Sequence, residues 1–153
     1  SKPNHVSATP VAALQRLFLK INPSAVISGH TWGRVYLTPY GDKMEHSENK
    51  ADYDRIVGQM CKLSGYRMMR ACDMYGANGL NNPPIRAMGE GNYGLPIHGT
   101  EVDWYYRNKA FSIVMEFGTH QRIPTVTDTK TEFDKTWNAA LLFIQEGPKV
   151  TIK

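Results

Sequence analysis

The sequence predicts one α/β domain whose helices pack on a mixed, mainly parallel β-sheet. Helix-like and strand-like segments alternate along the chain, which is the pattern of this fold class. The length of 153 residues suffices for one hydrophobic core but not for two ordinary domains. With 41% hydrophobic and 21% charged residues, the composition is near the globular average and excludes wholesale disorder or a fibrous repeat.

The first half of the chain contains two helix signals and three strand signals. A helix is expected from Thr9, a suitable N-cap followed by a proline, to the Asn22-Pro23 pair. A second helix is expected to end at Gly65. Short strands are expected at 25–28, where Gly29 breaks the first, and at 35–37 and 66–69. Apolar residues at helical spacing form one face of each helix: Val11, Leu14, Leu17 and Phe18 in the first, and Tyr53, Ile56, Val57, Met60 and Leu63 in the second.

The second half begins with a long segment, 73–99, that is rich in Gly, Asn and Pro. A segment of that length without regular structure usually shapes a site or is mobile. Thr100 is expected to cap a short helix, and an apolar strand follows at 110–115. The last helix ends at Gly147-Pro148 and shows one apolar face, made by Phe133, Trp137, Ala140, Leu141 and Ile144.

Charge, hydropathy and cysteine content narrow the class of function. Eighteen basic and fourteen acidic residues leave a net charge of +4, and the basic residues are scattered, which argues against nucleic-acid binding. The longest apolar runs, such as 139–144, are far shorter than the ~20 residues that a membrane span needs. Cys61 and Cys72 are compatible with one disulfide bridge or with two buried thiols.

Two polar residues stand where strands of the predicted sheet end. His30 follows the strand that ends at Ser28, and Glu116 stands at the end of the strand at 111–115. Ligands collect at the carboxyl ends of strands in such sheets, and a His and a Glu converging there suit a metal ligand and a general base. The alternative is a hydrogen-bonded loop histidine and a capping carboxylate, and spacing alone does not separate the two.

Four segments, in the right order, resemble the zinc metallocarboxypeptidases, the pancreatic carboxypeptidase family. Segment 30–41, HTWGRVYLTPYG, resembles the family's HSYSQ…LYPYG segment, with no gap between the His and the Pro-Tyr-Gly. Segment 99–106 resembles its GGSxDW motif, and 111–116 resembles its YSFTFE strand. Residues 123–124 and the helix with Trp137 resemble its LLP…TW end. The resemblance implies that residues 1–153 form the C-terminal portion of one carboxypeptidase-like catalytic domain.

The resemblance also implies a zinc site. His30 aligns with the family's third zinc ligand, and Glu116 aligns with the glutamate that activates the attacking water. The first two ligands, a His-x-x-Glu pair, lie in the part of the domain that this chain does not match. His98 and Glu101 fit those letters, but they fall inside the GGSxDW segment, where the family has no ligand, so we interpret the match as coincidence.

Four further residues align with positions that hold the substrate, or lie beside them. Thr31 and Trp32 follow the zinc-ligand position. Val102 aligns with the floor of the specificity pocket, where an aliphatic side chain implies a preference for apolar or aromatic C-terminal residues. Leu95 stands where the family has a mobile substrate-binding Tyr, and the nearby Tyr93 is an alternative for that role.

Together these features predict a zinc-dependent carboxypeptidase that is one chain of a proteolytically processed, two-chain enzyme. A companion N-terminal chain would supply the remaining strands, the other zinc ligands and the arginines that bind the substrate's terminal carboxylate. The protein is expected to be secreted or extracellular, to act on peptides, to bind no nucleic acid and to have no membrane span. The alternative is an inactive or repurposed carboxypeptidase-like protein that binds a peptide or a partner, which the Leu95 position and the long 73–99 segment favour.

Overall fold

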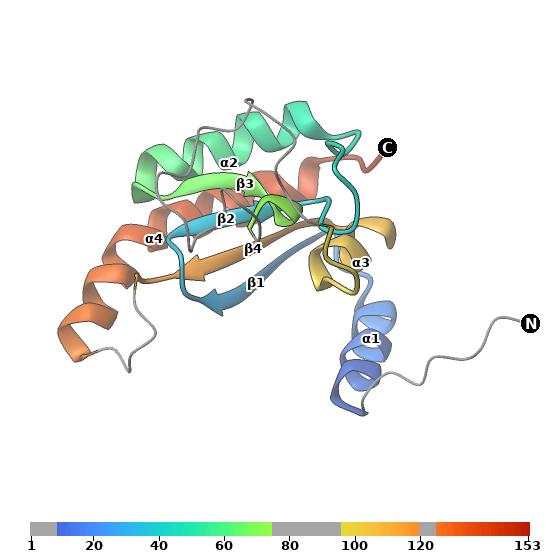
Figure 1. The fold of residues 1–153 in the computed structure, drawn as a ribbon, viewed down its shortest axis with the longest axis horizontal. Coiled ribbons are helices and arrows are strands. Elements are labelled where there is room, and N and C mark those ends of the chain that lie inside the picture. The colour runs from blue at the N-terminus through green and yellow to red at the C-terminus, as the bar shows by residue number, and fades with distance from the viewer. Residues whose placement is uncertain (1–8, 75–95, 120–124) are drawn as a thin grey trace, which may run out of the picture.

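The computed structural model describes residues 9–74, 96–119 and 125–153. Helices and strands alternate along these residues, which confirms the predicted α/β class (Figure 1). The main elements are α1 (Thr9–Ile21), β1 (Ala25–Thr31), β2 (Val35–Thr38), α2 (Lys50–Ser64), β3 (Arg67–Arg70), α3 (Glu101–Arg107), β4 (Phe111–Phe117) and α4 (Val126–Glu146). Two short 3-10 helices, η1 (Ala71–Asp73) and η2 (Gly147–Lys149), complete the set.

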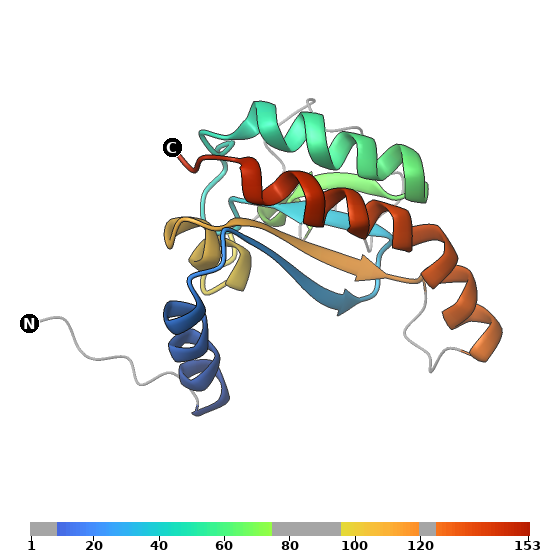
Figure 2. The ribbon, with the colours of Figure 1, turned by 180° about the vertical axis from the view of Figure 1, so that it is seen from behind.

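The strands form one sheet in the order β1-β4-β2-β3. β1 runs parallel to β4 and β2 runs parallel to β3, while β2 and β4 are antiparallel, so the sheet is mixed and mainly parallel as predicted. Within the described part of the chain, β1 and β3 are the two edge strands. The long helices α2 and α4 lie side by side over one face of this sheet (Figure 2).

Side-chain alternation along β4 separates the two faces of the sheet. Phe111, Ile113 and Met115 join the larger core cluster, which packs the sheet against α2 and α4. Val114 points the other way, into a smaller cluster that includes Val102 of α3. By the same alternation, Glu116 belongs to the face opposite α2 and α4.

The second helix matches its prediction closely. Gly65 follows α2 in the left-handed conformation, with φ 73°, and its N–H donates to the carbonyl of Cys61 at 2.9 Å. Tyr53, Ile56 and Met60 are buried in the core, but Leu63 is 52% exposed, so the apolar face ends one turn earlier than predicted.

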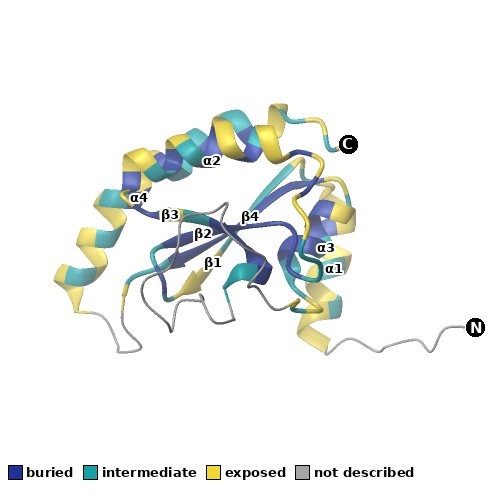
Figure 3. Ribbon diagram, turned by 45° about the horizontal axis from the view of Figure 1, so that its top comes forward, coloured by how far each residue is buried: buried dark blue, intermediate teal, exposed yellow. Residues whose placement is uncertain are grey.

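Only parts of the predicted apolar faces of the first and last helices are buried. In α1 only Phe18 is buried, between the rings of Trp104 and Tyr105 at centroid distances of 5.0 Å. In α4 the buried residues are Thr136, Ala139 and Phe143, whereas Phe133 and Trp137 stack on each other near the surface. The predicted residues that remain about half exposed or more are Val11, Leu14, Leu17, Phe133, Trp137 and Ile144 (Figure 3).

Cys61 and Cys72 are both free thiols rather than a bridge; Cys72 is buried and Cys61 is partly buried. Burial raises the pKa of each thiol to about 11. No helix in the described ranges is long and apolar enough to cross a membrane.

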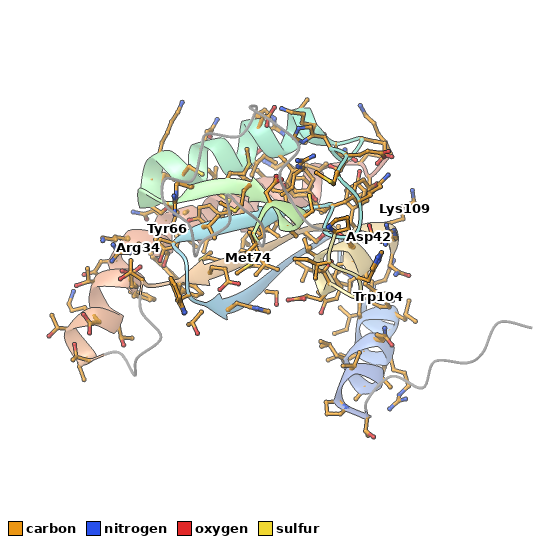
Figure 4. The ribbon with its side chains drawn as sticks, in the orientation of Figure 1. Arg34, Asp42, Tyr66, Met74, Trp104 and Lys109 are labelled. Atoms are coloured by element: carbon orange, nitrogen blue, oxygen red, sulfur yellow. The ribbon has the colours of Figure 1, made fainter. Side chains whose placement is uncertain are left out.

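A partly buried carboxylate links α4 to residues at the ends of β2 and β3. Glu132 of α4 accepts hydrogen bonds from the guanidinium of Arg34, with Nε at 3.0 Å, and from the hydroxyl of Tyr66. Figure 4 labels Arg34 and Tyr66, which lie close together at one end of the sheet. Burial raises the pKa of Glu132, but the hydrogen bonds and the positive charge outweigh it and hold that pKa below its usual value.

We predict that Glu132→Gln lowers the free energy of unfolding in a pH-dependent way. Because the folded-state pKa is depressed, the carboxylate stabilises the protein above its unfolded pKa, and that stabilisation is lost as the pH falls through the folded pKa. The expected loss is about 1–3 kcal/mol at pH 7 and shrinks below pH ~4.3, measured by urea unfolding. The control is Glu45→Gln, because the Glu45 side chain is 71% exposed and pairs with the nearby Lys43. If Glu132→Gln lowered the free energy of unfolding equally at pH 7 and below pH ~4.3, the charge of Glu132 would not be the source of the stabilisation.

Candidate active site

His30 and Glu116 face each other across two neighbouring strands. The sequence places His30 after a strand that ends at Ser28, but β1 continues through Gly29 to Thr31, so that His30 lies inside it. The parallel register of β1 and β4 pairs His30 with Glu116. Paired residues in a parallel ladder point to the same face, so both side chains lie on the face opposite α2 and α4. The predicted convergence of these two residues is therefore present.

Glu116 is a buried carboxylate with an unsatisfied oxygen. The residue is 3% exposed, and its Oε2 atom has no hydrogen-bond partner among the described residues. Burial raises the pKa of Glu116; His30 acts to lower it and the nearby charge of Glu101 acts to raise it further. A carboxylate in these surroundings is a better proton acceptor than an exposed one, as a general base requires.

His30 lies between two carboxylates rather than one. Its Nε2 is 2.6 Å from Oε1 of Glu101, and its Nδ1 is 3.8 Å from Oε1 of Glu116. The same Glu101 oxygen accepts a hydrogen bond from the hydroxyl of Ser28 at 3.1 Å. The His30 side chain is 46% exposed, so the cluster opens to solvent on the imidazole side.

Glu101 is the site residue that sequence reasoning missed. It is the first residue of α3, and the sequence marks it only as an acidic residue after Thr100. Glu101 also forms a His-x-x-Glu pattern with His98, but this pattern does not explain why Glu101 belongs to the site. His98 is exposed, and Glu101 contacts His30 and Ser28.

The remaining predicted site residues differ in exposure and in distance along the chain from His30. Thr31 is exposed at the end of β1, and Trp32 follows it partly exposed, both next to His30 in the chain. Val102 is 1% exposed and packs among Val35, Leu37 and Val114, so its side chain contributes to the smaller core cluster. Leu95 lies outside the described residues, as do Tyr93 and 123–124.

Two of the family-like segments are joined by one buried carboxylate. Asp103 of α3 is 2% exposed and accepts hydrogen bonds from the backbone N–H groups of Gly41, at 2.9 and 3.0 Å, and Asp42, at 3.0 Å. The contact is tight, because a Cβ atom on Gly41 would lie 2.9 Å from side-chain atoms of Thr100. Asp42, labelled in Figure 4, also pairs with Arg107 at the other end of α3, at 2.7 Å. These contacts fix the start of α3, and therefore Glu101, relative to the sheet.

The described residues hold only part of a metal site. They contain no group of three or more His, Cys, Asp or Glu side chains arranged to hold a metal ion. They do provide an imidazole that suits zinc and, beside it, a buried carboxylate with an oxygen left without a partner. This donor set fits one ligand and one base of a catalytic zinc site whose other ligands come from elsewhere.

The fold is metallocarboxypeptidase-like. Among solved structures, the chain is similar to the crystal structure of thrombin activatable fibrinolysis inhibitor (TAFI), with a TM-score of 0.58 over 96% of this chain. The sequence identity is 13%, and the match spans 34% of the TAFI chain. No protein-family model and no curated protein sequence matches the chain. The comparison therefore establishes the fold alone.

We predict that Asp103→Asn destabilises the protein by about 1–3 kcal/mol, because an amide nitrogen would then face a buried backbone N–H group. Chemical denaturation measures the loss. The matched control is Asp134→Asn, since Asp134 is exposed and pairs with Lys130 along one helix. A change no larger than the control would mean that Asp103 does not anchor the 41–42 turn.

Proposed function

We propose that this chain is part of a zinc-dependent peptidase that hydrolyses the C-terminal peptide bond of its substrate. The single observation that carries the proposal is the in-register pairing of His30 with Glu116, whose buried Oε2 has no hydrogen-bond partner among the described residues. This pair stands in a metallocarboxypeptidase-like fold, and its residue types suit a metal ligand and a general base. The protein is secreted or extracellular in this proposal.

His30 would hold zinc together with ligands from outside the described residues. When bound, the metal supplies Lewis-acid activation of the peptide carbonyl and of a water molecule. Glu116 accepts a proton from the attacking water and afterwards returns it to the leaving amine. Its burial favours the first step, because a raised pKa makes the carboxylate a better proton acceptor than an exposed one.

The preferred substrate has an apolar or aromatic C-terminal residue. Val102 supports this preference as an aliphatic residue in an apolar cluster on the site's side of the sheet. Glu101 is the competing influence, because a carboxylate near the site favours a Lys or Arg side chain. Its Oε1 is already engaged by His30 and Ser28, which leaves less of its charge for a substrate. Thr31 and Trp32, exposed or partly exposed beside His30, would contact the peptide.

A companion chain completes the domain in this proposal. The chain spans about a third of the length of TAFI. β1 pairs only with β4 among the described strands, so its other edge is available for a further strand. Next to that strand in the chain, α1 exposes Val11, Leu14, Leu17, Leu19 and Ile21, each by 49% or more. An apolar helix face beside an unpaired strand edge is the surface that the rest of a sheet and its core would cover.

A second candidate function is the binding of a peptide or protein without catalysis. The observation that favours it is the incomplete donor set, since no described group of residues can hold a metal by itself. The two functions differ in whether the assembled protein binds zinc and turns over substrate.

We predict that Glu116→Gln and His30→Ala separate the two roles in the assembled protein. Glu116→Gln removes the base but no ligand, so turnover should fall by about 10²–10⁴-fold while zinc content stays constant. His30→Ala should lose most of the zinc as well as activity. Turnover is measured on peptides ending in Phe or Leu and on peptides ending in Lys or Arg, and the apolar pair should be preferred. Full activity in Glu116→Gln would place the base elsewhere, and no turnover by the unmodified protein would favour the binding function.

We also predict that the native protein contains a second polypeptide with a His-x-x-Glu pair. Intact-mass analysis and light scattering should give an assembly heavier than this chain's 17.3 kDa. Leu17→Asp should weaken the association by about 10–100-fold, because a Leu side chain buried at an interface contributes roughly 1.5–3 kcal/mol. Arg16→Asp, at the preceding position of the same helix, should have a smaller effect. A 17.3 kDa monomer that unfolds cooperatively would contradict the proposal.

A further inference from the structure

The two ring nitrogens of His30 have different surroundings. Nε2 lies 2.6 Å from Oε1 of Glu101, within hydrogen-bond distance, whereas Nδ1 lies 3.8 Å from Oε1 of Glu116, beyond it. A neutral imidazole carries one proton and one lone pair, and a carboxylate oxygen can only accept a hydrogen bond from it. The proton therefore belongs on Nε2, and the lone pair belongs on Nδ1, which faces Glu116.

The Glu101 carboxylate is held in place by groups outside the imidazole. Ser28, two residues before His30 and on the same face of β1, donates its hydroxyl to the same Oε1 at 3.1 Å. The first turn of α3 is fixed independently, because the hydroxyl of Ser112 in β4 donates to the carbonyl of Val102 at 2.8 Å. The carboxylate thus meets His30 in a position that the strand and the helix determine together.

We propose that Glu101 is a positioning residue that fixes the tautomer and orientation of His30, with the proton on Nε2 and the lone pair on Nδ1. Glu101 contacts no reacting atom in this assignment and acts through the imidazole. The use of the lone pair as a zinc donor rests on the proposed function, whereas the tautomer itself does not. Carboxylates that accept the second N–H of a metal-binding histidine commonly have this effect.

The direct test is nitrogen NMR of the intact assembled protein, with 15N-labelled histidine and no added metal. In its neutral form, which the nitrogen chemical shifts themselves identify, His30 should show the pattern of a single tautomer protonated at Nε2. Glu101→Ala should convert this pattern to one averaged between the two tautomers. Glu101→Gln should restore it, because the amide oxygen accepts the same hydrogen bond. Glu45→Ala, which removes an exposed carboxylate paired with Lys43, should leave it unchanged.

Ser28→Ala provides a variant that keeps Glu101 in place, should Glu101→Ala fail to fold. It removes one donor to Oε1 but leaves the His30 contact, so the Nε2-protonated pattern should persist. A His30 protonated at Nδ1 in the unmodified protein would overturn the proposal, and so would an unchanged pattern in folded Glu101→Ala.

Zinc titration by calorimetry separates this inference from the proposed function. Glu101→Ala should weaken zinc binding by about 10–100-fold, and Glu101→Gln should recover part of it. If the Nε2 proton is found but the unmodified assembly binds no zinc, the positioning role stands and the peptidase proposal fails. If zinc binds with full affinity in folded Glu101→Ala, the positioning role fails and the peptidase proposal stands.

Discussion

The parallel pairing of β1 with β4 is the constraint on which the candidate site depends. It places His30 opposite Glu116 on the face of the sheet that α2 and α4 leave uncovered. A shift of one residue in either strand would turn one of the two side chains toward the core, where Phe111, Ile113 and Met115 are packed. The aromatic core on that side therefore does more than stabilise the sheet, because it sets the register that brings a histidine and a carboxylate together.

Helix α3 is the second element on which the site depends, because two of its acidic residues contact other segments of the fold. Asp103 binds the backbone of the 41–42 turn, and Glu101 binds His30 of the neighbouring strand. Segments that are distant in the chain, around residues 30, 41, 101 and 116, thus meet through a few short contacts. In this network His30 and Glu101 contact each other, whereas Oε2 of Glu116 has no hydrogen-bond partner among the described residues.

Sequence reasoning recovered the α/β class, the mixed sheet and α2 with its Gly65 cap, because periodicity and turn chemistry report local structure directly. It misplaced His30, since a glycine at position 29 resembles a strand end but is accommodated inside β1. In α4 it chose Phe133 and Trp137 over the buried Ala139 and Phe143, because apolar residues lie on more than one side of that helix and spacing does not tell which side meets the sheet. In α1 it grouped the buried Phe18 with residues that stay exposed. No sequence pattern predicts the role of Glu101, since that role arises from its contact with His30, which lies 71 residues earlier in the chain.

In the proposed site, His30 would offer Nδ1 to a zinc ion while Glu116 stays free as a base. A crystal structure of the zinc-loaded assembly, with anomalous diffraction recorded at the zinc edge, measures this most directly. The account predicts a zinc peak about 2.0–2.1 Å from Nδ1 of His30, with Glu101 still bound to Nε2 and with Glu116 outside the coordination sphere. A zinc ion bound through Nε2, coordinated by Glu116, or located away from His30 would contradict it.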